Sequence, residues 1–247
     1  MGPDSPIFPI TLLDSVGSTN DEALAAGRAG APHGWTVAAR AQTAGRGRRG
    51  HVWESPRGNL YLSVVLRPQV GPSRLPGLAA ACGLGVTDVL REARLKWPND
   101  LLAEGRKLAG ILVEAARDDS GEPFAVCGLG VNVERAPREL GAICLAELCD
   151  KGVVADCHKR DNWLRPLCHS IVARVDAWAA AEGERPLDGI RDDYLSRLCW
   201  LGEKVRVLAA DDGAELARGT FETVDPWGRA VVDGVAYAAE QASLRPA

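Results

Sequence analysis

Residues 45–59 read GRGRRGHVWESPRGN, and the first six letters match the G-x-G-x-x-G pattern of dinucleotide-binding βαβ units. In such a unit the third glycine opens a helix, and an acidic residue follows about 20 positions later to bind a ribose hydroxyl. Here Pro56 and Gly58 break any helix after Gly50, and residues 65–70 contain no acid. No GK[ST] ending follows either. The context therefore excludes both a dinucleotide-binding turn and a P-loop.

What remains is a glycine-spaced loop with four arginines in twelve residues, namely Arg46, Arg48, Arg49 and Arg57. The arginine side chain presents a rigid fork of donors that suits phosphate and carboxylate oxygens. Four such charges repel one another unless an anion lies between them. Glycines at positions 45, 47 and 50 allow the loop to be disordered when empty and to close over a ligand. A solvated charged turn is the alternative, and the segment alone favours neither.

The segments around this loop predict an α+β fold, with a mixed β-sheet and flanking helices. Thr19 and Glu22 form a capping box at the start of a helix that Gly27 or Gly30 ends. Strands are expected at residues 36–42, 59–68, 95–103, 107–115 and 124–134, and further helices at 75–93, 161–182 and 187–199. Beyond Trp200 the turns DDG and DPWG separate short strands of the kind that closes a small barrel. We therefore expect domains at residues 1–199 and 200–247.

The composition narrows the class of protein. A chain of 247 residues with 46% hydrophobic and 25% charged residues is ordinary for a globular protein with a sizeable core. The net charge of −4 gives no overall basic field, which argues against DNA or anionic lipid as a partner. Apolar runs are far shorter than the roughly 20 residues of a membrane span, and the N-terminus does not resemble a signal peptide. A cytoplasmic protein is predicted.

Most of the seven cysteines are predicted to pack as small apolar side chains, because they stand in apolar segments such as AACGLG and FAVCGLG. Their odd number and the absence of a CxxC pair argue against a disulfide framework. The cluster of Cys144, Cys149, Cys157–His158 and Cys168–His169 does not have the paired spacing of a structural zinc site.

Several other short segments carry polar residues suited to a ligand, each with a structural alternative. In KWPND (96–100), Lys96 suits phosphate, and Asn99 with Asp100 suits Mg²⁺, although a strand end with an Asx turn fits as well. Lys107 in KLAG opens an apolar strand, where its amine either binds an anion or lies in water. Asn132 stands in the apolar run GLGVNV, so its amide must bind backbone or ligand. Ser18–Asn20 form either a helix cap or an anion-friendly helix start.

Taken in order, these segments resemble the signature blocks of biotin protein ligases, the biotin–[acetyl-CoA-carboxylase] ligases. The blocks are STN, AQTAGRGRRGHVWESPRGNLYLSVVLRP, KWPNDLL, RKLAGILVE and GLGVNV, and a looser likeness extends to GTFETVDPWGRAVV near the C-terminus. The resemblance implies a class II synthetase-like catalytic domain with a small SH3-like C-terminal β-barrel. It also implies a two-step reaction: biotin and MgATP give biotinyl-5′-AMP, and a lysine of a biotin carboxyl carrier protein then takes the biotinyl group.

The resemblance carries roles over to particular residues. Catalytic roles are implied for Lys107, Arg48 and Arg46. Biotin contacts are implied for Ser18, Thr19, Asn20, Gln42, Gly45, Arg46, Arg48, Lys107 and Gly110. Contacts with ATP or the adenylate are implied for Arg48, Trp53, Lys96, Asn99, Asp100, Asn132 and Arg245, with Asp100 and Asn132 as Mg²⁺ ligands. His51 and Glu54 depart from the family pattern, and Glu54 weakens the positive field of the loop.

Three alternatives are weighed against this hypothesis. A ligase–repressor with an N-terminal DNA-binding module needs on the order of 60 more residues, and 17 residues precede Ser18, so a monofunctional ligase is expected. A lipoate ligase or octanoyltransferase shares the catalytic architecture but should lack the arginine block and the C-terminal β domain. A non-catalytic biotin- or nucleotide-binding module is disfavoured by the intact set of motifs. Whether the protein forms a homodimer is left open.

Overall fold

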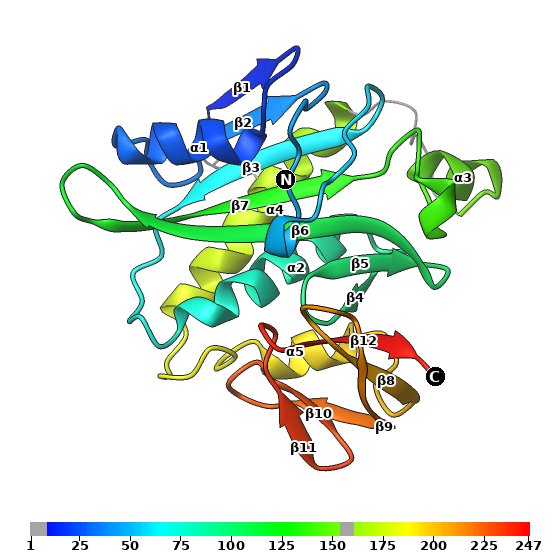
Figure 1. The fold of residues 1–247 in the computed structure, drawn as a ribbon. Helices are drawn as coiled ribbons and strands as arrows, with labels where there is room; N and C mark the ends of the chain where they lie inside the picture. The colour runs from blue at the N-terminus through cyan, green and yellow to red at the C-terminus, as the bar shows by residue number, and fades with distance from the viewer. Residues whose placement is uncertain (1–8, 154–160) are drawn as a thin grey trace.

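The computed structural model describes residues 9–153 and 161–247, and its larger part is a seven-stranded mixed sheet. The strands are β1 (Ile10–Leu13), β2 (Thr36–Ala39), β3 (Leu60–Leu66), β4 (Arg94–Lys96), β5 (Asp100–Ala103), β6 (Arg106–Arg117) and β7 (Pro123–Val131), in the order β1-β2-β3-β7-β6-β5-β4 (Figure 1). Strands β1 and β2 run parallel, and every other neighbouring pair is antiparallel. The predicted mixed sheet is confirmed.

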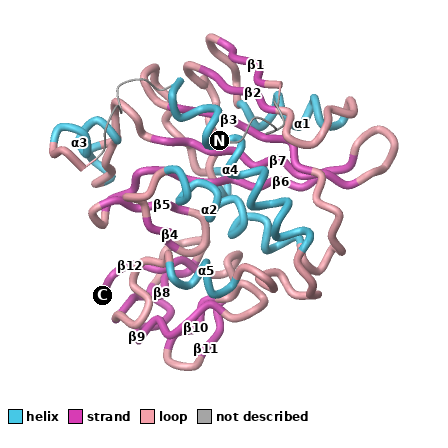
Figure 2. Tube along the Cα trace, turned by 180° about the vertical axis from the view of Figure 1, so that it is seen from behind, coloured by secondary structure: helices cyan, strands magenta, loops and turns pink. Residues whose placement is uncertain are grey.

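Helices cover both faces of this sheet because its central strands are apolar on both sides. On one face Val37, Val65 and Phe124 pack around Ala23 of α1 (Thr19–Arg28). On the other face Leu62 and Val64 belong to the main core with α2 (Leu78–Val89) and α4 (Asp161–Ala180). Figure 2 shows α2 and α4 side by side across that face. Strand β3 is thus buried at every position, as a central strand between two helical layers must be.

The start of α1 differs from the prediction. The N-cap residue is Ser18, Thr19 is already helical, and no side chain caps the helix. The Thr19 hydroxyl instead donates to Gln42, a residue of the loop after β2. The predicted capping box is therefore wrong, because a tertiary contact takes the group that would have formed it. Gly30 follows the helix with φ +87°, as the predicted glycine stop requires.

Several element boundaries also differ from the prediction. The single strand expected at residues 95–103 is two strands, β4 and β5, because a turn at residues 97–99 reverses the chain. Two elements were not predicted: strand β1 forms the outer edge of the sheet, and α3 (Leu145–Asp150) is a short helix after β7. Helix α5 (Arg191–Ser196) occupies part of the segment predicted as a helix at 187–199.

The C-terminal unit, defined as residues 200–247, contains a second sheet that is antiparallel throughout. Its strands are β8 (Lys204–Ala209), β9 (Glu215–Val224), β10 (Ala230–Val232), β11 (Val235–Tyr237) and β12 (Ala242–Pro246), in the order β11-β10-β9-β8-β12. Figure 1 shows it beneath the large sheet, with α5 between the two. The first strand of the second sheet begins at Lys204, and the division into domains at 199/200 stays a prediction.

The C-terminal unit is packed firmly against the rest of the chain. Val207 and Phe221 belong to the same buried cluster as Leu101 in β5. The indole Nε1 of Trp97 donates to the carbonyl of Gly228 at 3.0 Å. These contacts fix the position of the C-terminal unit beside the KWPND segment.

Among the described residues, no helix has the length and apolar character needed to cross a membrane. Within the described ranges, five cysteines are free thiols, namely Cys82, Cys127, Cys144, Cys168 and Cys199. Cys149 is disulfide-bonded, although the sequence argued against a disulfide framework. Within the same described ranges, no group of three or more His, Cys, Asp or Glu side chains is placed to hold a metal ion. Cys157 and His158 lie outside the described residues.

Candidate functional site

A recess on the α1 face of the sheet is formed by three glycines on β6 and β7. Gly110 pairs with Gly130, and Gly128 pairs with Ser63 of β3, so all four residues face the same side as α1. A Cβ at Gly130 would lie 2.5 Å from the indole of Trp53, and one at Gly128 would clash with the amide of Asn20. The glycines therefore make room for groups that lie directly on the sheet.

A buried polar network lines one end of this recess. The backbone N–H and hydroxyl of Thr19 donate to Gln42 Oε1 at 2.8 and 3.0 Å, and Gln42 Nε2 donates to Ser55 Oγ at 2.8 Å. Ser63 Oγ donates to Asn20 Oδ1 at 2.6 Å and lies 2.8 Å from Thr19 Oγ1. The network brings together the predicted residues Thr19, Asn20 and Gln42 from α1 and the loop after β2. The hydrogen bonds also fix which way each amide points.

Glu114 extends this network to the arginine loop. Its carboxylate accepts from Asn20 Nδ2 at 2.6 Å and from Arg46 at 3.1 Å. Arg46 is also paired with Asp21 of α1 at 2.6 Å. Arg46 is thus held by two carboxylates from different elements, which fixes the first arm of the loop to the sheet and to α1.

At the other end of the recess, one carboxylate lies between two lysines. Asp100 Oδ2 is 2.8 Å from Lys96 Nζ, and Asp100 Oδ1 is 2.6 Å from Lys107 Nζ. Burial alone would raise the pKa of Asp100, but the two ammonium groups outweigh it and hold this pKa below its usual 3.8. Burial lowers the pKa of Lys96, an effect that Asp100 opposes and Arg245 reinforces. The cluster keeps a surplus of positive charge at the edge of the recess.

Trp53 lies over the glycines between these two ends. A Cβ at Gly110 would be 3.0 Å from its ring, and Lys107 Nζ lies 5.1 Å from the ring centroid, a cation–π distance. Its indole Nε1 is buried without a hydrogen-bond partner among the described residues. The sequence assigned Trp53 to the adenine end of a ligand, and the structure places its ring against Lys107.

The arginine loop is a tight hairpin. Trp53 N donates to Gly45 O at 2.9 Å, Gly47 N donates to His51 O at 2.7 Å, and Arg46 pairs with Val52. Residues Arg48–Gly50 form a single 3₁₀ turn at its tip, which crosses in front of β6 in Figure 1. Arg48 at the tip donates to Asn99 Oδ1 at 3.1 Å and to the carbonyl of Ala239 at 2.8 Å. Burial lowers the pKa of Arg48, and the neighbouring charge of Arg49 lowers it further.

Asn132 and Arg245 have a less direct relation to the recess. The Asn132 side chain is buried, and its Nδ2 donates to the carbonyls of Ile143 at 3.2 Å and Lys107 at 3.4 Å. Its amide nitrogen is therefore taken by backbone, which supports the structural alternative and leaves only its oxygen for a ligand. Arg245 lies on β12 and acts on Lys96 through its charge.

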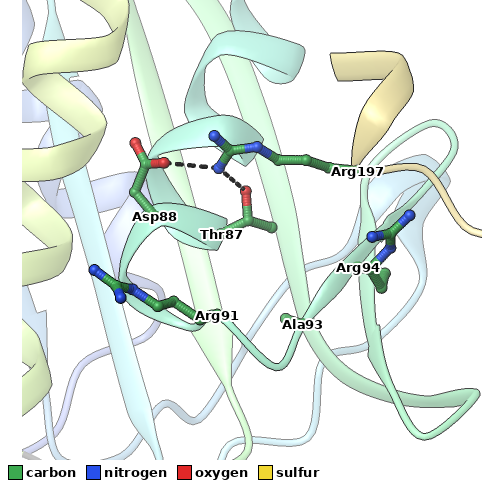
Figure 3. A pocket seen from close by; sticks show the side chains of 6 residues that line it. All are labelled: Thr87, Asp88, Arg91, Ala93, Arg94 and Arg197. Carbon is green, nitrogen blue, oxygen red and sulfur yellow. Dashed lines mark hydrogen bonds and ion pairs between the residues drawn. The ribbon is translucent and has the colours of Figure 1, made fainter. Parts of the chain in front are cut away.

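A second hollow lies elsewhere on the molecule and contains none of the predicted site residues. It is lined by Thr87, Asp88, Arg91, Ala93, Arg94 and Arg197. Figure 3 shows Arg197 directed at Asp88 and Thr87, with distances of 2.7 and 2.9 Å. Arg174 also pairs with Asp88, at 2.5 Å. These ion pairs tie α2 to α4 and α5, which is a structural use of the charges.

Sequence reasoning missed Ser55, Ser63 and Glu114. Ser63 and Glu114 both stand in strands that are mainly apolar, so both carried the same signal as Asn132, a polar side chain where an apolar one is expected. Their proximity to Asn20 depends on the register of β3, β6 and β7, which local sequence does not reveal.

Comparisons with known proteins show the family of the chain. The model of the biotin/lipoate A/B protein ligase family matches residues 13–132. A biotin--[acetyl-CoA-carboxylase] ligase from Mycobacterium tuberculosis is 36% identical over 235 residues, which are 91% of this chain and 83% of that protein. The chain belongs to the biotin/lipoate A/B protein ligase family. Within this family, a biotin--[acetyl-CoA-carboxylase] ligase from Paracoccus denitrificans is 33% identical over 91% of this chain and 94% of its own length.

A solved structure of the same family extends the likeness to the whole fold. The biotin protein ligase from Aquifex aeolicus in complex with biotin and ATP has a TM-score of 0.78 and 26% sequence identity, and the match covers 98% of this chain and 100% of that one. The family model ends at residue 132, whereas the structural match covers 98% of the chain and so extends into the C-terminal unit.

Proposed function

We propose that the protein is an ATP-dependent biotin protein ligase. In the first step the carboxylate of biotin attacks the α-phosphorus of MgATP, which forms biotinyl-5′-AMP and releases pyrophosphate. In the second step a lysine amine of a biotin carboxyl carrier protein attacks the acyl carbonyl, which forms an amide and releases AMP. The observation that carries the proposal is the convergence of Lys96 and Lys107 on Asp100 at the edge of a glycine-lined recess, with Arg48 bound to the neighbouring Asn99.

This arrangement fits a reaction that needs no protein nucleophile. Both substrates of the first step are anionic, so the protein must bring them together and offset their charge. Lys107 is assigned to the biotin carboxylate and the α-phosphate, because its ammonium group lies between Asp100 and the ring of Trp53. Arg48 is assigned to the same phosphate, because its guanidinium is bound to Asn99, next to Asp100. When biotin and MgATP bind, Asp100 keeps the two lysines apart and oriented.

The polar network is assigned to the ring end of biotin. Gln42 lies next to Gly45 at the base of the hairpin and shares a hydrogen-bond network with Thr19 and Asn20, which follow the buried N-cap residue Ser18. The ureido group of biotin offers both donors and an acceptor for these residues. These groups bond to one another in the structure, and a carboxylate substrate with an apolar tail, such as octanoate, has no polar atoms at that end to exchange for those bonds. That difference favours biotin over the lipoate and octanoate alternative.

Mg²⁺ enters as part of the substrate MgATP. Asp100 is an oxygen donor of the right kind, but both its oxygens are already bound to ammonium groups. Asn132 offers only its amide oxygen. We therefore assign Mg²⁺ mainly to the phosphates, with Asp100 as its one carboxylate neighbour, and a direct role of Asn132 stays a prediction.

Pyrophosphate exchange into ATP tests the proposal. Biotin, lipoate and octanoate are offered separately at saturating MgATP, with no carboxylic acid as the blank. We expect exchange with biotin only. Exchange with lipoate or octanoate but not biotin would establish the alternative function, and no exchange with any of the three would refute a ligase of this family type.

Two further expectations stay predictions, namely the cytoplasmic location and the SH3-like character of the C-terminal unit as a separate domain. The sequence leaves open which carboxylase is the acceptor and whether the protein forms a homodimer. Transfer of biotin to a purified carrier domain, and the molar mass in solution, test these two questions directly.

A further inference from the structure

Arg49 has no role in the proposed chemistry, yet it makes long-range contacts from the tip of the arginine loop. Its Nη1 donates to the carbonyl of Ala210 at 3.2 Å, and its Nη2 donates to the carbonyl of Ala239. Both alanines belong to the C-terminal unit, 161 and 190 residues further along the chain. The guanidinium thus spans two separate turns of the C-terminal unit.

The carbonyls of Ala210 and Ala239, together called the seat of Arg49, are held in fixed positions by backbone hydrogen bonds. Ala210 follows β8, and its N–H donates to the carbonyl of Gln241 at 2.9 Å. Gln241 N and Ala242 N both donate to the carbonyl of Ala238, at 3.0 and 3.1 Å. The turns that present the Ala210 and Ala239 carbonyls are therefore bonded to each other and to the start of β12.

The backbone of the hairpin tip is shaped to direct Arg49 at this seat. Arg49 has φ +57° and Gly50 has φ +75°, both in the left-handed region. For a residue other than glycine this conformation costs about 1 to 3 kcal/mol, so glycine would be the less strained choice at position 49. The strain is therefore offset by what the arginine side chain contributes. Its hydrogen bonds to the described residues go to the C-terminal unit.

We propose that Arg49 is a positioning residue, which fixes the tip of the hairpin to the C-terminal unit and so holds Arg48 and Trp53 over the recess. The inference rests on the proposed function for its catalytic consequence. Arg48 shares the Ala239 carbonyl with Arg49, so the same seat sets the direction of the arginine assigned to the phosphate. Arg46 fixes the first arm of the hairpin to two carboxylates, those of Asp21 and Glu114. The hairpin is thus held at its base by the large sheet and at its tip by the small one.

The geometry explains why arginine is needed rather than any cation. One guanidinium reaches two carbonyls with two different nitrogens, whereas a lysine ammonium is a single point that reaches one of them. Arg49→Lys keeps the positive charge but cannot bond both carbonyls at once. Arg49→Gly removes the side chain and suits the positive φ, so the backbone of the tip is preserved. Arg57→Lys is the matched control, because Arg57 lies on the same segment and its ion pair with Asp14 is long, at 3.6 Å.

The first readout does not depend on activity. Amide hydrogen exchange is measured on the full chain without ligand, for peptides that cover residues 45–53. We expect faster exchange in Arg49→Lys and Arg49→Gly than in the wild type and in Arg57→Lys, with unchanged exchange in β3 and β7. Wild-type exchange at residues 45–53 in both Arg49 variants would overturn the proposal.

The second readout is the retention of biotinyl-5′-AMP by the enzyme after rapid gel filtration. Hydrogen bonds to charged groups contribute more than neutral ones, and Arg49 is exposed, so we expect roughly five- to tenfold faster loss in Arg49→Lys. Thermal midpoints should match the wild type, which separates positioning from a general loss of stability. Retention equal to the wild type in Arg49→Lys refutes the catalytic consequence. A wild type that forms no biotinyl-5′-AMP refutes the proposed function instead, and the exchange experiment still decides whether Arg49 holds the hairpin.

Discussion

Replacing Asp100 by asparagine should leave two lysines without their counter-charge. An unpaired charge costs more free energy on Lys96 than on Lys107, because only 8% of the Lys96 side chain is exposed, whereas 38% of the Lys107 side chain is exposed. At an effective dielectric constant of about 20, a separation of 2.8 Å corresponds to a gross attraction of about 6 kcal/mol. Part of it is offset because the variant no longer buries a carboxylate. Removal of one partner from a buried pair costs about 3 to 5 kcal/mol, and solvent around Lys107 reduces its share, so we expect a loss of about 3 kcal/mol.

The dependence of this loss on pH distinguishes an uncompensated charge from a packing defect. Burial lowers the pKa of Lys96 below 10.5, and the variant lacks the carboxylate that opposes this effect. In the folded variant Lys96 therefore loses its proton at a lower pH than in the unfolded chain. Because the unfolded state then binds more protons, stability rises with pH. The deficit of Asp100→Asn should thus shrink between pH 7 and the ordinary lysine pKa of 10.5.

Urea denaturation of the wild type and the variant, at several pH values, measures both effects. Glu104→Gln is the matched control, since Glu104 also contacts two cations, Arg106 and Lys151, but lies on the surface, where such pairs contribute about 0 to 1 kcal/mol. The double variant Lys96→Met/Asp100→Asn should recover most of the loss. A deficit below about 1 kcal/mol, or one that does not change with pH, would refute the account of Asp100 as the counter-charge of buried Lys96.

Two further predictions concern the recess and the helices behind the sheet. Gly130→Ala places a Cβ 2.5 Å from the Trp53 indole, so we expect a loss of about 1 to 3 kcal/mol and a higher KM for biotin, whereas Gly71→Ala, with only Ser73 nearby at 3.9 Å, should change neither. An unchanged KM in Gly130→Ala would contradict the position of Trp53. Arg174→Met should lower stability by about 1 kcal/mol at neutral pH without changing pyrophosphate exchange. Burial would raise the pKa of Asp88, but Arg174 and Arg197 hold it below 3.8, so this contribution is lost as the pH falls below that value, and a loss of equal size at acid and neutral pH would count against it.

The strands of the large sheet could be predicted because their apolar runs are long and bounded by turns. Strand β3, with seven buried residues between Asn59 and Arg67, is the clearest example. Strand β1 could not be predicted in the same way, because two of its four residues are exposed and its pairing with β2 is a tertiary contact. The capping box at Thr19 failed for a related reason, since Gln42 competes for the hydroxyl.

The candidate site could be predicted as a set of segments, but not as a geometry. Residue types placed Lys96 and Lys107 near an anion and Asp100 near Mg²⁺, yet the convergence of both lysines on Asp100 depends on the pairing of β4, β5 and β6. The role of Arg49 was beyond local sequence, because its partners are backbone carbonyls. Any residue type can supply a carbonyl, so Ala210 and Ala239 carry no signal in their letters.

The chain segment that leads from the large sheet to the C-terminal unit, at residues 197–199, has a consequence for folding. Leu95 N donates to Arg197 O at 2.8 Å and Cys199 N donates to Leu95 O at 2.7 Å, so the chain closes the free edge of β4 just before it enters the C-terminal unit. A chain truncated at residue 199 would therefore end at the residue that bonds to Leu95. The truncation would also expose the side of the core that Phe221 covers. The two sheets should melt together in one cooperative transition. The point at which the chain passes from one sheet to the other therefore does not separate two independently stable units.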